Sequence, residues 1–345
     1  MKRAKLWGAL LVIAGILIRP EFAVAGAQRA MRLWYSSVAP AMFPFLALLP
    51  VLTGPDACAA YNATFSRLMR PLFGLPGAAA PALVISMISG SPGGALAVRR
   101  IASEARLPSS EARRLALALG GVSPAYLILG VGMGLYGSMA LGIRLALIQL
   151  AIQLLLLLLL RGFIEDREDQ AVTLPLREYD QGPLRAAVES VLVVCGYMVL
   201  FSSVCGVIAS FVGEHAGTAL LLVSDLPSGL AELAEWDIPG KMLIQGAAIG
   251  FGGLCIAAQN LDALRSLGIT VSEYLSVRGV AAAIFAGVSG LALEPRGKGV
   301  EIYVGGGSRV YAFSLLIAGA AVLPVLFFFT KTFCFNNRDV GTKRP

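Results

Sequence analysis

The chain has 345 residues, of which the hydrophobic residues account for 57% and the charged residues for only 14%. Soluble domains carry about 25% charged residues, and a mean hydropathy of +0.76 implies more apolar surface than a soluble fold can bury. A soluble enzyme, a disordered chain and a coiled coil are therefore excluded, and a polytopic membrane protein is predicted. The net charge of +7 comes from Lys and Arg at the edges of apolar runs, where they act as topology signals, so no nucleic-acid partner is expected.

The first segment is predicted to be an uncleaved transmembrane helix over residues 1–20. Three basic residues precede the apolar run Leu6–Ile18, and Ala23-Val24-Ala25 resembles a signal cleavage site. The charged Arg19-Pro20-Glu21 separates the two, which argues against cleavage. The following stretch, 22–35, carries two arginines on an otherwise apolar pattern and is predicted to be an amphipathic helix in the membrane interface.

Two long uncharged runs contain too much Gly and Pro for a continuous helix. The first is centred on Ser89-Gly90-Ser91-Pro92-Gly93-Gly94, and the second has Gly246, Gly250, Gly252 and Gly253 at its middle. Both are predicted to be re-entrant hairpins, at about 76–103 and about 238–265, with a kinked structural span as the alternative. Non-helical backbone at membrane depth requires a polar cavity or surrounding protein.

The two broken segments are also succeeded by similar sequences. Ser109-Ser110-Glu111 and Val271-Ser272-Glu273 each have the pattern of a helix start, ~160 residues apart. Such pairs of broken segments mark the binding site of inverted-repeat transporters. We therefore expect a first repeat over 21–160, a charged linker over 161–185, a second repeat over 186–330 and a basic tail over 331–345, with the side of the tail left open.

Several polar residues have both a binding and a structural interpretation. Ser123-Pro124 comes after Gly120-Gly121, a combination that should unwind the helix and either expose the Ser hydroxyl to a cavity or form a packed kink. Arg99 and Arg100 either face an anion or anchor the interface. Glu232 is either a site residue or a loop acid. Gln259 and Asn260 either bind a ligand or tie the hairpin to its neighbours.

Enzyme chemistry has no support in the sequence. There is one histidine and no CxxC pair among five cysteines, which excludes the usual zinc and haem motifs. Gly132-x-Gly134-x-x-Gly137 matches a dinucleotide fingerprint, but it lies in an uncharged run and favours close helix packing instead. No cofactor and no metal site are predicted.

Specific motifs in both halves resemble one family, the sporulation integral membrane protein YlbJ (stage V sporulation protein V) family. In the first half these are Met42-Phe43-Pro44-Phe45, Leu68–Gly74 and Ser89-Gly90-x-Pro92-x-Gly94. In the second half they are Gly229-Leu230-Ala231-Glu232 and Gly250–Leu254 followed by Gln259. The resemblance implies a gate, or nucleoside-recognition, domain similar in architecture to concentrative nucleoside transporters: an all-α fold of two inverted repeats with re-entrant helical hairpins.

The role implied by the resemblance is movement of dipicolinic acid across the outer forespore membrane during endospore formation. The sequence departs from the family pattern at Ser91, Leu96, Ser123, Ala234 and Ala257, which puts the substrate rather than the fold in doubt. Alternative functions are carriage of a nucleoside or another small polar metabolite, and a non-transporting membrane scaffold in spore assembly. A homo-oligomer or a sporulation membrane partner stays open.

We expect the two glycine turns, 90–94 and 250–253, each to hold one carboxylate of this planar dianion. Helix N-termini present free N–H groups, and glycines allow the backbone to approach closely. The expected substrate-binding residues are Ser89, Gly90, Ser91, Gly93, Gly94, Ser123, Glu232, Gly250, Gly252, Gly253 and Gln259.

Overall fold

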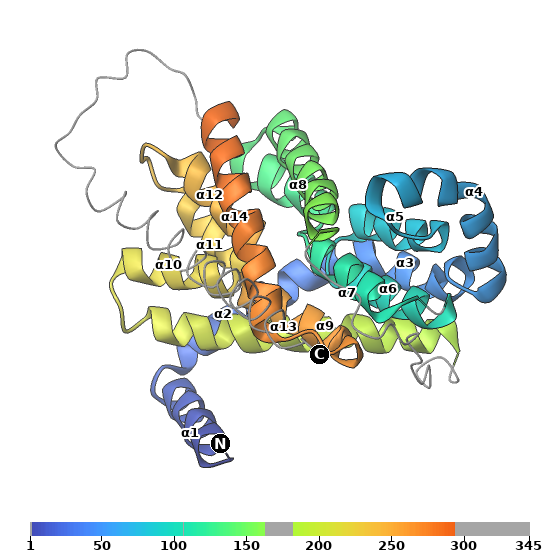
Figure 1. The fold of residues 1–345 in the computed structure, drawn as a ribbon. Helices are drawn as coiled ribbons and strands as arrows, with labels where there is room; N and C mark the ends of the chain where they lie inside the picture. Colours follow the sequence, from blue (N-terminus) through green and yellow to red (C-terminus); the bar gives the residue numbers. More distant parts are fainter. Residues whose placement is uncertain (1, 106, 163–181, 294–345) are drawn as a thin grey trace, which may run out of the picture.

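The computed structural model describes residues 2–105, 107–162 and 182–293, and within these ranges it contains helices and no strand (Figure 1). Four helices are long and apolar enough to cross a membrane, or up to six if each of two bent helix pairs counts as one span. The expected all-α membrane protein is therefore confirmed. Most of the predicted linker, the last part of the second repeat and the basic tail lie outside the described residues.

The N-terminal region forms two helices that meet at Pro20. Helix α1 (Lys2–Ile18) and helix α2 (Pro20–Leu33) belong to a pair bent by 100°. The small residues of α2 pack on helix α9 (Pro183–Ala209), and a Cβ on Gly26 would lie 2.4 Å from the backbone oxygen of Ser202. The helix predicted over 22–35 is therefore present as α2, and α9 covers its small residues.

The rest of the first half places a short hairpin beside a broken helix. Its elements in chain order are η1 (Trp34–Val38), α3 (Ala39–Leu52), α4 (Pro55–Phe73), η2 (Gly77–Ala79), α5 (Ala80–Ser89), α6 (Gly93–Glu104), α7 (Ser109–Ala118), η3 (Tyr126–Leu135) and α8 (Met139–Leu160). Helices α5 and α6 pack against each other across the 90–92 turn. The chain is non-helical at 120–123, as the Gly120-Gly121 and Ser123-Pro124 pairs predict.

Glycines decide how closely these elements approach. A Cβ on Gly93 or Gly94 would lie 2.4 or 2.6 Å from the hydroxyls of Ser89 and Ser86, so the two small residues let α6 lie against α5. Gly132 of η3 packs on Gly142 of α8 in the same manner, which confirms the packing interpretation of the dinucleotide-like motif.

The second half begins with α9, which runs crosswise to α8 and α14 in Figure 1. The elements after it are α10 (Glu214–Ser224), α11 (Leu226–Ala234), α12 (Lys241–Phe251), α13 (Gly253–Ala263), η5 (Arg265–Leu267) and α14 (Val271–Leu293). Helix α9 contacts α2 and α3 of the first half and α10 and α13 of the second. It therefore joins the two halves.

The second broken segment differs from the predicted hairpin. Helices α12 and α13 meet at Gly252 and together form one candidate span of 23 residues. Gly252 and Gly253 both have positive φ, +86° and +83°, and this pair interrupts the helix without reversing the chain. The prediction of a hairpin over 238–265 is therefore wrong, and the alternative of a kinked span describes this segment.

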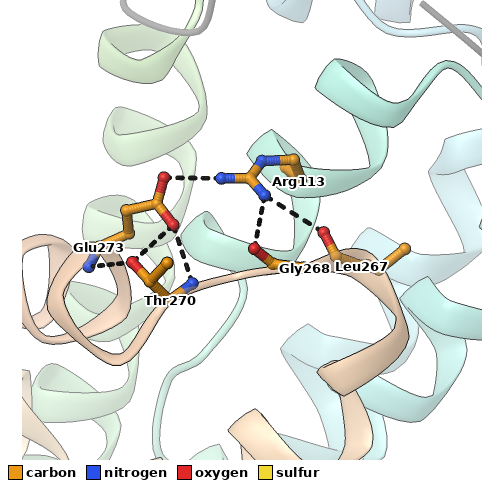
Figure 2. A network of polar contacts seen from close by, with 5 residues as sticks. All are labelled: Arg113, Leu267, Gly268, Thr270 and Glu273. Carbon is orange, nitrogen blue, oxygen red and sulfur yellow. Dashed lines mark hydrogen bonds and ion pairs between the residues drawn. The ribbon is translucent and has the colours of Figure 1, made fainter.

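A polar cluster fixes α7 of the first half to the start of α14 in the second (Figure 2). The Arg113 guanidinium donates to Glu273 Oε1 at 2.6 Å and to the carbonyl oxygens of Leu267 and Gly268 at 3.2 and 2.8 Å. Glu273 Oε2 in turn accepts from the backbone N–H and the hydroxyl of Thr270 at 2.8 Å, which caps α14. The predicted helix starts at Ser109 and Val271 are both confirmed.

Candidate functional site

The main cavity lies between the two halves and has a volume of about 390 Å³. Its walls come from η1, α3, the α5–α6 turn, the 120–123 break and η3 on one side, and from α9, the α10–α11 junction and α13 on the other. The polar residues on these walls are Ser36, Ser89, Ser91, Ser123, Tyr126, Asp225, Cys255 and Gln259. Small-molecule sites in proteins have volumes of ~300–1,000 Å³ and combine apolar walls with a few polar groups, as this cavity does.

The break at 120–123 places Ser123 on the wall of this cavity. Gly120 and Gly121 leave room for Tyr274 and for the amides of Gln149 and Gln153, since a Cβ at either glycine would lie within 2.6 Å of these side chains. The Gly121 carbonyl, which is not part of a helix, still has a hydrogen-bond partner, because the N–H of Ser91 donates to it at 3.0 Å. Ser123 Oγ is buried and has no hydrogen-bond partner among the described residues.

The α5–α6 turn supplies two further hydroxyls. Ser89 Oγ donates to the Ile85 carbonyl at 2.8 Å. Ser91 Oγ accepts from the Asn260 amide at 2.9 Å, and the same amide donates to the Tyr274 hydroxyl at 2.6 Å. Asn260 therefore ties α13 to the turn, which is the structural interpretation of this residue, while its Oδ1 is buried without a partner among the described residues.

Gln259, one residue earlier, lines two cavities. It borders the main cavity and also a second cavity of about 270 Å³, and it shares this position with Val194 of α9. The second cavity is more polar, with Arg99, Glu189, Tyr197 and Asp262 on its walls. Gln259 thus lies between a mostly apolar cavity and a more polar one. Arg99 lies on the more polar side, whereas Arg100 is buried in α6 and pairs with Glu104 at 3.4 Å.

The acid that borders the main cavity is Asp225, which no sequence motif singled out. It lies at the junction of α10 and α11, is 7% exposed, and its Oδ2 accepts from Ser228 Oγ at 2.7 Å. Burial raises the pKa of the Asp225 carboxyl, against the opposing effects of its hydrogen bonds and of the Arg29 charge. The only sequence signal is an acid placed before Leu-Pro at a helix start.

The predicted acid, Glu232, lies elsewhere. It is on α11, outside the walls of the main cavity, where it accepts from the Thr218 hydroxyl at 2.7 Å. This bond links α11 to α10, so Glu232 joins the two helices that flank Asp225. Within the described residues, the structure thus favours a structural role for Glu232.

The predicted glycines also lie outside the cavity walls, and most of them have packing roles. Gly90 faces the Ser123 backbone, since a Cβ there would be 2.4 Å from Ser123 Cα. A Cβ on Gly250 would be 2.6 Å from the Ala281 carbonyl oxygen of α14, and one on Gly253 would be 3.4 Å from Leu226. The members of the expected set that line the main cavity are Ser89, Ser91, Ser123 and Gln259, and those that do not are Gly90, Gly93, Gly94, Glu232, Gly250, Gly252 and Gly253.

Comparison with known proteins finds a similarity to a sporulation protein along most of the chain. The chain is 25% identical over 325 residues to the sporulation integral membrane protein YlbJ of Bacillus subtilis (strain 168), across 80% of this chain and 79% of that protein. No family model and no solved structure matches. A similarity that extends along most of both chains supports the YlbJ family for this protein, in agreement with the motifs noted in the sequence.

Proposed function

We propose that this chain, an integral membrane protein of the YlbJ family, carries a small organic anion across a membrane during sporulation without altering it chemically. Dipicolinic acid is the substrate that we propose, and the outer forespore membrane is the proposed location. The proposal rests on one observation above all. Both halves of the chain line a cavity of about 390 Å³, and its walls carry the polar residues Ser89, Ser91, Ser123 and Gln259.

The chemistry of the walls suits a flat heteroaromatic acid. Met42, Tyr126, Val194 and Met198 provide apolar surface for a ring. Ser123 lines the cavity, and its buried hydroxyl has no partner among the described residues. Rotation of this side chain toward the cavity would let the hydroxyl donate to a carboxylate without loss of a protein hydrogen bond. The Ser91 hydroxyl, which accepts from Asn260, and the Gln259 amide, which gives one N–H to Cys255 Sγ, add donors from the turn and from α13. The Ser89 hydroxyl already donates to the Ile85 carbonyl.

The arrangement of the two halves supports movement rather than static binding. A more polar second cavity adjoins the main cavity at Gln259 and Val194, so a substrate that passes these two residues would leave the mostly apolar space. The short α5–α6 hairpin lies beside this boundary and is the first element that we expect to move. Inverted repeats, with the hairpin and the α12–α13 break at matching positions, are part of the proposal.

Equilibrium binding of labelled dipicolinate to the purified protein tests the substrate. Ser123→Ala should weaken binding roughly tenfold, the equivalent of one lost hydrogen bond to a charged group. Ser210→Ala is the matched control, because Ser210 lies at the end of α9 and its hydroxyl donates to the Val207 carbonyl away from the cavity.

Competition identifies the substrate class. Unlabelled dipicolinate should displace the label, and a nucleoside should not. Displacement by nucleosides alone, or equal affinity in Ser123→Ala, Ser210→Ala and wild type, would contradict the proposal. Binding by none of the three proteins would favour the scaffold alternative.

A further inference from the structure

The main cavity contains a carboxylate and no cationic side chain among the described residues that line it. An anion that entered this space would meet Asp225 at close quarters in an environment of low polarity. Two like charges in such a site repel each other strongly. Binding of an anion therefore requires that Asp225 be neutral, and the simplest way to neutralise a carboxylate is to protonate it.

We propose that Asp225 is a proton carrier, so that each anion moved through the cavity is accompanied by one proton. This inference rests on the proposed function and adds its energy source. A proton from one aqueous side binds the Asp225 carboxylate and forms an O–H bond. The substrate then binds next to the neutral acid, and after release on the opposite side the same O–H bond breaks and the proton leaves. A dianion would thus carry a net charge of −1 in each cycle.

The surroundings of Asp225 allow both protonation states. Burial favours the neutral acid. The start of α11 directly after Asp225, and the hydrogen bond from Ser228, favour the carboxylate. A carrier needs this balance, because a group held firmly in one state cannot load and unload a proton.

The groups that face Asp225 come from four other elements. They are Arg29 of α2, Tyr126 of η3, Cys205 of α9 and Cys255 of α13. Arg29 is exposed on α2, whereas Tyr126 and Cys255 line the cavity with Asp225. None of these four neighbours is a carboxylate, so Asp225 is the group in this cluster that is suited to exchange a proton near neutral pH.

The test uses the full chain in proteoliposomes with labelled dipicolinate and an internal pH dye. Two quantities are measured: exchange of label at equal pH on both sides, and net uptake driven by an inward proton gradient. In the wild type we expect both, with internal acidification that depends on dipicolinate. Asp225→Asn imitates the protonated acid, so it should retain exchange, while its rate of gradient-driven uptake should fall at least tenfold. Its exchange should also become independent of pH.

Asp237→Asn is the matched control, since it makes the same chemical change at an exposed acid between α11 and α12. It should behave like the wild type. Gradient-driven uptake and a wild-type pH profile in Asp225→Asn would overturn the proposal. If Asp225→Asn shows no exchange, the measurement on the wild type is decisive, because dipicolinate uptake by the wild type without proton entry would also overturn the proposal. Absence of any exchange in the wild type would instead contradict the proposed function itself.

Discussion

Two glycines at the helix breaks differ in how closely other parts of the chain pack against them, and this difference can be tested by substitution. Gly90 and Gly252 both have positive φ, +66° and +86°. Their surroundings differ, since a Cβ on Gly90 would lie 2.4 Å from Ser123 Cα and 2.5 Å from its N, while a Cβ on Gly252 would meet nothing within 4 Å. Their values of ψ differ too: Gly252, at −10°, is in the left-handed region, while Gly90, at −156°, is in a region that essentially only glycine adopts. Alanine should therefore cost more at Gly90, through its backbone and through crowding.

The magnitudes come from these two contributions. The left-handed backbone of Gly252 costs an alanine roughly 1–2 kcal/mol, and the backbone of Gly90, with a ψ of −156°, costs it about 1–3 kcal/mol. Overpacking against fixed backbone adds about 1–3 kcal/mol, and this applies to Gly90→Ala alone. We expect Gly252→Ala to lose ~1–2 kcal/mol of the free energy of unfolding and Gly90→Ala ~2–6 kcal/mol.

Thermal unfolding in one detergent, followed with a thiol-reactive dye, measures the difference. Cys58, Cys205 and Cys255 are buried and free, so their reaction reports loss of the fold. The midpoint should fall clearly further for Gly90→Ala than for Gly252→Ala. Equal midpoints, or a lower midpoint for Gly252→Ala, would show that the hairpin turn does not press on the Ser123 backbone and would refute this reasoning.

Contacts between the halves allow three further predictions. Arg113→Gln should lower the free energy of unfolding by ~1–3 kcal/mol, because it removes a partly buried ion pair and weakens two bonds to backbone carbonyls; the same dye assay measures it. Asn260→Leu should weaken dipicolinate binding, because the Ser91 hydroxyl loses the amide that orients it, while the amount of protein in the membrane stays the same. Binding isotherms measure the first effect, and the yield of membrane protein measures the second. Gly26→Val should separate α2 from α9 and destabilise the fold, whereas Gly8→Val, with open space around it, should leave the unfolding midpoint in place.

Local chemistry predicted a large part of this fold. The helix starts at Ser109 and Val271, the unwound segment at 120–123 and the α5–α6 hairpin are all encoded by Gly, Pro and capping residues in the sequence. The α12–α13 segment has the same kind of composition, yet it does not turn back. Glycines show where a helix can break, but the direction of the chain after the break depends on packing, here of α12 along α14.

The candidate site could be predicted only in part for a similar reason. Ser89, Ser91, Ser123 and Gln259 lie beside the breaks, and proximity in sequence was enough to find them. The neighbouring glycines were expected to hold the substrate, but the open sides of most of them are filled by backbone or side chains of adjacent helices. Asp225 faces the cavity only because α10 and α11 fold onto their neighbours, α10 onto α9 and α13 and α11 onto η3, which no short motif encodes.

The most direct test of transport is counterflow of labelled dipicolinate into proteoliposomes that contain the full chain and unlabelled dipicolinate. We predict saturable uptake well above that of empty vesicles, and roughly tenfold weaker apparent affinity in Ser123→Ala. Uptake by the wild type no faster than by empty vesicles, with the protein shown to be folded by its thermal transition, would contradict the proposed function.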